Sequence, residues 1–539
     1  MRPLLPASSG CFAVITSRSR LAGLGTREGA ARVTLDILSP EEAVELLGQV
    51  IGPARVAAEP DAAFQMADLC GHLPLALRVV AEHAASRPAL SLNGLLEELR
   101  DERHRLDALA DREDELSDVR TVFSWSYRAL DPELRRTFRL LGLHPAPEFG
   151  IGAAAALTGT GERGTARRLR ELTSAHLLQE PKDGRFRLHD LLRAYALECT
   201  SAEDTQHSRI RAVRQMLGWY LHATDRGRKV ILPHSHEVPL VPAAQLSLPV
   251  FLDAAQAMGW FEQERQNLVA AMRQAYELGQ YDIAWKLPVT ADGFFELGSH
   301  WPEWKEVHQL GLEAAQALGD ALGEASNLFC LGDAAWRGGG YEEALENYHR
   351  TLDIARILGD TWLEGFTLRG LGLIHEEQND FSEANALFVK ALEVFRDGGW
   401  RRGEGMALLS LSRSARAAGD IEQAITLGQQ ATRIFEALPD EWSTAWTALS
   451  LGPALRQRGR AAEAETCLRR AVDTFARFTD RQSEAMAWEA LAEVFEEARN
   501  RTDAQRSWVR AAQLYELLRH DKSAELYERA ARLASPPED

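Results

Sequence analysis

The sequence predicts a mainly α-helical protein whose C-terminal half is an α-solenoid of paired helices. Residues that favour helices, above all Ala, Leu, Arg and Glu, dominate the composition. Residues 331–511 repeat one pattern of Leu and small residues at a fixed period of 40. A clear strand signal occurs only near the start of the chain, where 11–16 form a short apolar run before polar residues.

The run at 11–16 has the length and β-branched content of a buried strand in a parallel sheet. A single strand cannot form a sheet, so its partners lie elsewhere or the chain begins in the middle of a domain. From Ser39 onward the chain is expected to be helical, because Ser39 is a good N-cap and Pro40 suits the first helical position. Further helices are expected at 62–69 and from Pro74. The highly charged stretch 101–118 indicates a solvated helix or a linker.

A compact unit is predicted between 119 and 200. The apolar spacing indicates four helices, at 119–129, 132–141, 151–157 and 163–173. Two short runs, 177–180 and 185–188, flank a Lys-Asp-Gly turn and predict a hairpin. Helices followed by a hairpin in a segment of this length are typical of a winged helix.

The repeat with a period of 40 is the strongest signal in the chain. Each repeat begins with a leucine followed by a small residue, and an alanine stands thirteen positions after each leucine. The residues that define the repeat are Leu331, Gly332, Ala344, Leu371, Gly372, Ala384, Leu411, Ala424, Leu451, Gly452, Ala464, Leu491 and Ala504. Small residues at fixed places let two antiparallel helices approach closely. We expect 281–320 to be a weaker, atypical capping repeat and 521–534 to be a final helix that closes the other end.

This pattern resembles the tetratricopeptide repeat, a helical hairpin whose first helix carries a Leu-Gly pair. The period of that family is usually about 34 residues, so the longer period of this chain implies longer helices or turns. The resemblance implies that the concave face of 281–534 binds a protein or a peptide. A solenoid that binds nothing is the alternative.

Four segments before residue 200 resemble the later part of an NB-ARC module, the nucleotide switch of STAND-type signalling proteins. In the family's order they are 14–18 (Val-Ile-Thr-Ser-Arg), 71–77 (Gly-His-Leu-Pro-Leu-Ala-Leu), 138–145 (Phe-Arg-Leu-Leu-Gly-Leu-His-Pro) and 187–193 (Arg-Leu-His-Asp-Leu-Leu-Arg). The resemblance implies that Arg18 contacts the terminal phosphate, Pro74 packs on adenine and His189 contacts the β-phosphate of ADP. Leu188 stands where the family has Met.

The resemblance also implies a domain order. Residues 1–37 would be a remnant of the nucleotide-binding sheet, 38–118 the helical domain, 119–200 the winged helix and 201–280 a helical linker. Together with the repeats, this order is similar to the C-terminal part of actinobacterial antibiotic regulators of the SARP class. It implies a regulatory protein with a partial ADP- or ATP-binding switch, and one that forms homo-oligomers when activated.

The sequence departs from the family at the phosphate-binding loop. It contains no Gly-x-x-x-x-Gly-Lys-Ser/Thr, the motif whose backbone and lysine hold the phosphates, so we expect no ATPase activity. The acidic strand that should precede the sensor strand would lie before Met1. Two explanations stay open: a truncated or mis-started reading frame, and a natural remnant that kept the later domains.

Composition and charge exclude several other classes. Apolar residues make up 45% and charged residues 26%, which excludes a largely disordered chain. A net charge of −18 opposes binding to nucleic acid or to an anionic membrane. Five scattered cysteines without a CxxC pair indicate reduced thiols in a cytoplasmic protein, and no apolar stretch is long enough to span a membrane.

Two further interpretations concern DNA and metals. DNA binding through the winged helix is the alternative function, carried by the locally basic cluster Arg163, Arg167, Arg168 and Arg170. No metal site is expected, since His144, His189, His234 and His236 show no metal-ligand spacing. We expect His234-Ser235-His236 to form a loop.

Overall fold

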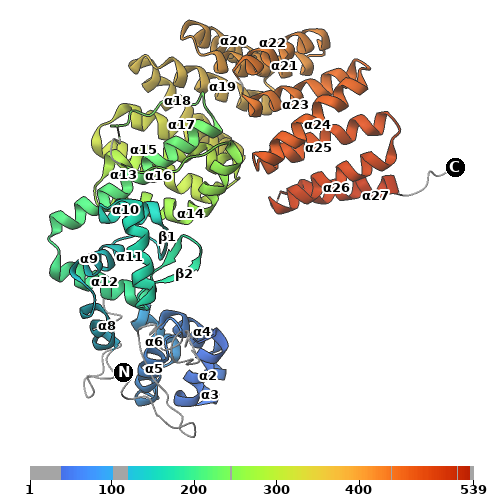
Figure 1. Ribbon diagram of the computed structural model, residues 1–539. Coiled ribbons are helices and arrows are strands. Elements are labelled where there is room, and N and C mark those ends of the chain that lie inside the picture. The colour runs from blue at the N-terminus through green and yellow to red at the C-terminus, as the bar shows by residue number, and fades with distance from the viewer. Residues whose placement is uncertain (1–37, 101–118, 243–245, 439, 519, 535–539) are drawn as a thin grey trace, which may run out of the picture. The chain divides into compact units, whose positions relative to one another are not determined.

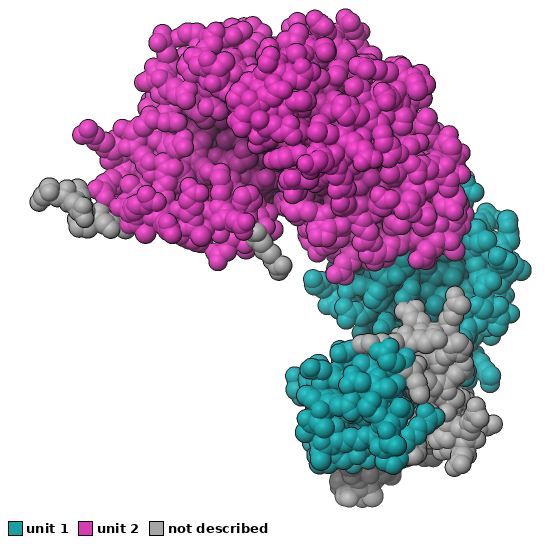
Figure 2. All heavy atoms as spheres, turned by 180° about the vertical axis from the view of Figure 1, so that it is seen from behind, with its two compact units in different colours: residues 1–219 teal, residues 220–539 magenta. Residues whose placement is uncertain are grey.

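The computed structural model describes residues 38–100, 119–242, 246–438, 440–518 and 520–534. The predicted strand at 11–16, Arg18 and the charged stretch 101–118 lie outside these residues. The chain divides into two compact units, residues 1–219 and residues 220–539, which are coloured separately in Figure 2. Each unit is described by itself below.

The first part of unit 1 is a small group of helices. Its elements are α2 (Pro40–Ile51), α3 (Pro53–Ala58), α4 (Pro60–Leu69), α5 (Pro74–Ser86) and α6 (Leu92–Arg100). The predicted N-cap is confirmed, because Ser39 Oγ accepts from the Glu42 amide at 3.2 Å. Glu42 closes a capping box by accepting from the Ser39 amide at 2.8 Å. The helices bury Ala43, Leu47 and other apolar side chains in a common core.

The second part of unit 1 combines helices with a small antiparallel sheet. Its elements are α8 (Val119–Arg128), α9 (Pro132–Leu141), β1 (Glu148–Gly150), α10 (Ile151–Thr158), α11 (Glu162–Ser174), β2 (Gln179–Lys182), β3 (Arg185–Arg187) and α12 (Asp190–Glu203). The predicted hairpin is present as β2 and β3. The strand β1 pairs with β3, so the sheet order is β1-β3-β2. Sequence reasoning missed β1 because so short a strand is too small to show an alternating pattern.

The long helix α13 (Gln206–Ile231) contains the boundary between the units, which falls after Trp219. In unit 2 it is followed by an irregular segment and by α14 (Ala254–Glu277). A continuous series of helices then fills the rest of the described chain (Figure 1): α15 (Tyr281–Leu297), α16 (Trp301–Leu318), α17 (Ala321–Arg337), α18 (Tyr341–Leu358), α19 (Thr361–Glu377), α20 (Phe381–Asp397), α21 (Arg401–Ala417), α22 (Ile421–Ala437), α23 (Glu441–Gln457), α24 (Ala461–Arg477), α25 (Arg481–Glu497), α26 (Arg501–Leu517) and α27 (Lys522–Ala534).

The predicted period is confirmed by the helix starts. The helices α17, α19, α21, α23 and α25 begin at Ala321, Thr361, Arg401, Glu441 and Arg481, which keeps the register of the repeating leucines. We call the odd-numbered helices α15–α25 first helices and the even-numbered helices α16–α26 second helices. The segment 281–320, predicted to be atypical, forms α15 and α16 in this same register. Its side chains differ from the other repeats at the packing positions, which weakened the signal. The final helix is present as α27.

In several hairpins a small residue on one helix receives a large side chain from the other. A Cβ atom at Gly372 would lie 2.5 Å from the ring of Phe388, and one at Gly332 would lie 2.6 Å from the ring of Tyr348. In the hairpin formed by α21 and α22 both facing residues are small. Ser412 faces Gly428, and a Cβ atom on Gly428 would lie 2.5 Å from Leu451 of the following repeat. The alanines predicted to define the repeat are fully buried, at Ala344, Ala384, Ala424, Ala464 and Ala504.

The first helices form the inner face of the array. From α15 to α25 each first helix contacts the next first helix, whereas successive second helices from α16 to α26 make few contacts with each other. The array must therefore curve toward its first helices. Figure 2 shows unit 2 with a hollowed face. A curved array of this kind presents a concave surface on which an extended partner can lie.

We predict that filling the space beside Phe388 destabilises the array. Gly372→Ala should lower the free energy of unfolding by about 1–3 kcal/mol, because a buried ring must move to admit the methyl group. The measurement is urea unfolding followed by circular dichroism. The matched control is Gly259→Ala in α14, where nothing lies within 4 Å of an added Cβ. That exchange should stabilise the protein by about 0.5–1 kcal/mol. Equal destabilisation in both variants would contradict the claim that the ring of Phe388 excludes a side chain at position 372.

Candidate functional site

Charged side chains on the inner face join several first helices to the next. Arg413 on α21 lies 2.8 Å from Glu376 on α19. Arg456 on α23 lies 3.0 Å from Glu493 on α25. An ion pair between Arg337 on α17 and Glu296 on α15 completes the pattern at the start of the array. The inner face is therefore lined by charge, although the helices beneath it pack through apolar and small residues.

Two arginines in the middle of this face have no acidic partner. Among the described residues, no carboxylate lies within ion-pair distance of Arg369 or Arg416. The Nε atom of Arg369 donates to Ser410 Oγ at 3.1 Å. Burial, followed by the positive charge of Arg413, lowers the pKa of Arg369 to about 10. The same two causes lower the pKa of Arg416. A chain with a net charge of −18 thus holds, at this place, two arginines on which carboxyl groups such as Asp333 and Glu376 act only from beyond ion-pair distance.

The start of the inner face has the opposite character. Burial, followed by the negative charge of Glu296, raises the pKa of Asp333 to about 7. Asp333 accepts a hydrogen bond from the hydroxyl of Tyr348. Burial also raises the pKa of Glu296, although Arg337 acts against this shift. The inner face therefore holds buried carboxyl groups at α15 and α17, and arginines at α19 and α21.

The irregular segment 232–242, between α13 and α14, bridges two distant turns of the array. His236 Nε2 lies 2.8 Å from Asp360 Oδ2 in the turn before α19, and its ring packs on Trp362 with a centroid distance of 4.8 Å. His234 Nε2 lies 3.0 Å from the carbonyl oxygen of Leu438, in the turn before α23. The prediction that these histidines lie in a loop is confirmed. Their partners are a carboxylate and a carbonyl, and they do not converge on a common point.

The three residues predicted to contact nucleotide are only partly placed. Arg18 lies outside the described residues. Pro74 starts α5 and is exposed. His189 caps α12, and its Nδ1 accepts from the Leu191 amide at 3.4 Å. A Cβ atom on Gly71 would lie 1.5 Å from the His189 ring, so the ring occupies the space that any other residue at position 71 would fill. The structure thus brings the Gly-His-Leu-Pro-Leu segment and the His-Asp segment into contact.

The arginines considered for DNA binding lie on α11. Arg163, Arg167 and Arg170 are exposed. Arg168 is largely covered and pairs with Glu133 on α9, and Arg167 lies 3.7 Å from Glu171 on its own helix. Two of the four cations are therefore partly neutralised within the protein. DNA binding through this helix stays a prediction.

Sequence reasoning missed the residues of the inner face and one further cluster. Arg369, Arg413 and Arg416 fall on first helices close to the repeating leucines, so the register could have placed them on one face. It could not show which arginines lack partners. The structure also brings together Asp292, His308 and Cys330, three side chains of the metal-binding type, where no metal site was expected.

The repeated helices match a known family. Residues 312–397 match the tetratricopeptide repeat, as do residues 369–439 and 449–517. The array is built of tetratricopeptide repeats. The chain is also 32% identical over 352 residues to the regulatory protein AfsR of Streptomyces coelicolor, an alignment covering 64% of this chain and 35% of the relative. It is 34% identical over 332 residues to AfsR of Streptomyces griseus, covering 60% and 33%.

The predicted similarity to actinobacterial regulatory proteins is thereby confirmed. The chain spans about a third of the length of the curated relatives that it matches. Among solved structures, it is similar to a STAND signal transduction ATPase with a tetratricopeptide repeat sensor from Pyrococcus horikoshii. That alignment has 14% identity and a TM-score of 0.40, and it covers 94% of this chain and 73% of the other. Among the described residues, no helix combines the length and apolar character needed to cross a bilayer.

The raised pKa of Asp333 predicts a pH dependence of stability. The folded protein holds this proton with a pKa of about 7, above the ordinary value of 3.8, so the folded state binds the proton more tightly than the unfolded chain. The contribution of Asp333 is therefore fully present below about pH 4 and is lost as the pH rises through 7.

Asp333→Asn should remove this dependence while keeping an oxygen to accept from Tyr348. Between pH 5 and pH 8, the melting temperature of the wild type should fall further than that of the variant, as measured by circular dichroism. Asp473→Asn on the exposed face of α24 is the matched control and should behave as the wild type. An identical pH response in all three proteins would show that Asp333 is not held protonated.

Proposed function

We propose that this chain is a non-catalytic regulatory protein whose repeat array binds an acidic segment of a peptide or protein partner. The observation that carries the proposal is the pair of arginines, Arg369 and Arg416, which lie on the inner face without a carboxylate partner among the described residues. Similarity to the AfsR regulatory proteins supports a regulatory role, for the third of those proteins that the chain spans. The curvature toward the first helices supplies the surface.

The arginines suit a carboxylate-bearing partner for two reasons. Guanidinium groups hold carboxylates through paired hydrogen bonds in a fixed geometry. Burial and the neighbouring Arg413 disfavour the positive charge on Arg369 in the unbound protein. An incoming carboxylate would relieve that repulsion, so part of the binding energy comes from a strain that already exists in the free array.

The basic centre of the inner face also sets the direction of the partner. Above about pH 7, where Asp333 loses its proton, the start of the array around Glu296 and Asp333 repels carboxylates and attracts cations. A partner with an acidic stretch followed or preceded by a basic one would therefore lie along the array in one orientation. Polar and charged residues across an interface contribute chiefly to specificity and association rate, which suits a reversible regulator.

Binding can be tested with an acidic peptide as a probe. We expect a fluorescein-labelled peptide rich in Asp and Glu to bind the full chain, and binding to weaken as NaCl is added. The double variant Arg369→Gln and Arg416→Gln should weaken binding at least tenfold, since each loss leaves a carboxylate without its partner. The same variant should keep or raise the melting temperature, because it removes charges that burial disfavours.

The matched control replaces two exposed arginines on second helices, Arg433→Gln and Arg470→Gln, which changes the net charge by the same amount. Fluorescence anisotropy gives the dissociation constants. An equal loss of affinity in both double variants would mean that net charge alone attracts the peptide. No binding of the acidic peptide to the wild type would reject the proposed site.

We further propose that unit 1 is an ADP-responsive switch, with Arg18, Pro74 and His189 as its nucleotide-contacting residues. What supports this is the contact between the His189 ring and Gly71, three positions before Pro74. ADP held between these segments would fasten the helices α2–α6 to the sheet-containing part of unit 1. Binding of a partner by the repeats would then bias this two-state element. Because the printed sequence has no phosphate-binding loop, hydrolysis is not part of the proposal.

Bound nucleotide can be measured directly. The full chain is purified, denatured and separated from its small molecules, which are resolved by anion-exchange chromatography. We expect one ADP per chain in the wild type and little in His189→Ala. The control is His207→Ala, an exposed histidine on α13 of the same unit. An empty supernatant from the wild type, including after incubation with ADP, would reject the switch and leave the peptide-binding proposal untouched.

A further inference from the structure

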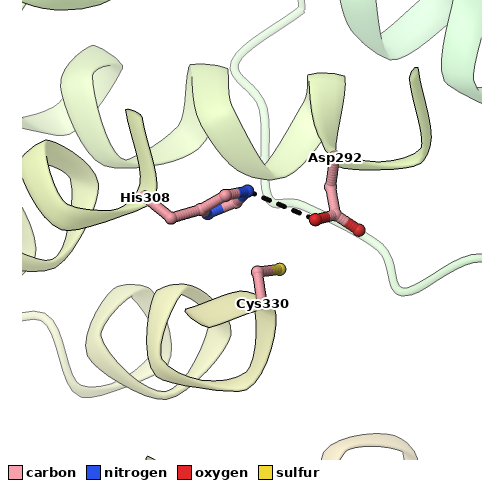
Figure 3. Close-up of side chains that lie close together, drawn as sticks. All are labelled: Asp292, His308 and Cys330. Atoms are coloured by element: carbon pink, nitrogen blue, oxygen red, sulfur yellow. Dashed lines mark ion pairs between the residues drawn. The ribbon is translucent and has the colours of Figure 1, made fainter. Parts of the chain in front are cut away.

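Three side chains of metal-ligand type converge where the first helical hairpin of the array meets the second. They are Asp292 on α15, His308 on α16 and Cys330 on α17, and one ligand atom from each lies within 4.8 Å of the others (Figure 3). The Nε2 atom of His308 is 3.2 Å from Asp292 Oδ1. His308 is fully buried and Cys330 is 4% exposed. None of the three belongs to the basic centre of the inner face.

Packing does not account for this choice of residues. One repeat later, the array has Gly332, Tyr348 and Gly370 in place of the three. There the tyrosine ring lies between the two glycines, since a Cβ atom at Gly332 or Gly370 would be 2.6 or 2.7 Å from it. The same space in the first hairpin holds a carboxylate, an imidazole and a thiol. Burying polar groups costs free energy. If these positions served packing alone, two glycines and an aromatic ring would therefore be more favourable than a carboxylate, an imidazole and a thiol.

The imidazole is held in the orientation that a ligand requires. Asn327 Nδ2 donates to the carbonyl oxygens of Gly323 at 2.9 Å and Trp285 at 3.3 Å, so its Oδ1 must face the histidine. That oxygen lies 3.0 Å from His308 Nδ1, which must therefore carry the proton. The other ring nitrogen, Nε2, then faces Asp292 and Cys330, and it can bind an ion when it carries no proton. An orienting hydrogen bond to the distal nitrogen is typical of metal-binding histidines.

The far nitrogen of the ring faces Asp292 Oδ1 at 3.2 Å without the geometry of a hydrogen bond. Among the described residues, His308 Nε2 is buried and has no hydrogen-bond partner, despite the nearby carboxylate. Such a group costs free energy unless something occupies its lone pair. The nitrogen is aimed at the space that Asp292 and Cys330 share.

The carboxylate is the member of the cluster closest to solvent. Trp304 Nε1 donates to Asp292 Oδ1 at 2.7 Å and helps to hold the carboxylate in place. The side chain of Asp292 is 24% exposed, whereas that of His308 is fully covered. An ion would therefore reach the cluster past Asp292. A fourth coordination position would face the same opening.

We propose that Asp292, His308 and Cys330 bind a zinc ion, with water or a partner side chain as the fourth ligand. A mixed set of sulfur, nitrogen and oxygen donors suits Zn²⁺. With ordinary zinc bond lengths, tetrahedral ligand atoms stand about 3.3–3.6 Å apart. The atoms here lie within 4.8 Å, so a small inward movement of the side chains completes the site. The thiol of Cys330 binds as thiolate and releases its proton to water.

Zinc at this place would tie together three helices from two successive repeats. The first hairpin, α15 and α16, would be fixed to α17 by coordination in addition to packing. The ion would thus stabilise the N-terminal end of the array, next to the acidic part of the inner face. This role does not depend on the acidic partner proposed above, so the two proposals can fail separately.

The site can be tested with Co²⁺, because this ion replaces Zn²⁺ at such sites and its absorption spectrum reports its ligands. The full chain is dialysed against a chelator, freed of it, and titrated with CoCl₂. We expect uptake of one equivalent, a thiolate-to-cobalt charge-transfer band in the near ultraviolet, and loss of the band when ZnSO₄ is added. Cys330→Ser should remove the charge-transfer band. The matched control Cys467→Ser, a cysteine on α24, should retain it.

A second variant tests the site independently, in case Cys330→Ser does not fold. His308→Gln should weaken Co²⁺ binding at least tenfold while leaving the far-ultraviolet circular dichroism unchanged. Added Zn²⁺ should raise the melting temperature of the wild type and of Cys467→Ser, but of neither site variant. The absence of a charge-transfer band in the wild type at excess Co²⁺ would overturn the proposal. So would a band that persists in Cys330→Ser or vanishes in Cys467→Ser.

Discussion

A small residue on one helix receives a large side chain from its neighbour, and the rest of the array depends on this contact. Where Gly372 meets Phe388, or Gly332 meets Tyr348, the ring lies where a Cβ atom would otherwise be. This contact sets the separation of the two helices in a hairpin. Because contacts of this kind recur along the array, successive hairpins keep a similar shape and stack in a regular way. The curvature toward the first helices follows from that stacking.

Because small and apolar residues hold the helices together, the exposed side of the first helices is free to carry charge. The charged side chains of the first helices differ in whether they are paired. Ion pairs such as Arg413 with Glu376 join neighbouring helices, while Arg369 and Arg416 have no carboxylate partner among the described residues. Burial, followed by the positive charge of Arg413, disfavours the charged form of Arg369 and lowers its pKa. Such groups are typical of surfaces that complete their interactions with a ligand.

Much of the fold follows from local sequence signals. The regular period of the repeats, the helix start at Ser39 and the hairpin around Gly184 all depend on residues close in the chain, and the structure contains all three. The strand β1 has no local signal, because two helices and another strand separate it from its pairing partner β3. The pairing of Gly71 with His189 is likewise non-local.

The functional surface was harder to predict than the scaffold. The repeat register places Arg369 and Arg416 on first helices, but whether each has a partner depends on side chains in the next repeat. The cluster of Asp292, His308 and Cys330 shows the same limit. Its members lie on three successive helices, at a spacing unlike that of the short metal-binding motifs. Only the stacking of these helices brings them together.

The pair of small residues Ser412 and Gly428, in the third of the five predicted repeats, has a consequence for how this array can evolve. Gly428 is filled by Leu451 from the next repeat, whereas Phe388 fills the space beside Gly372 in its own repeat. The segment 401–440 is therefore not interchangeable with its neighbours. A leucine stands at the position of Leu451 in every repeat, so duplication of this segment would again place a leucine beside Gly428. Deletion of the segment would instead bring Leu451 against Phe388, which stands where this repeat has Gly428. At this junction the array therefore tolerates the gain of this repeat better than its loss.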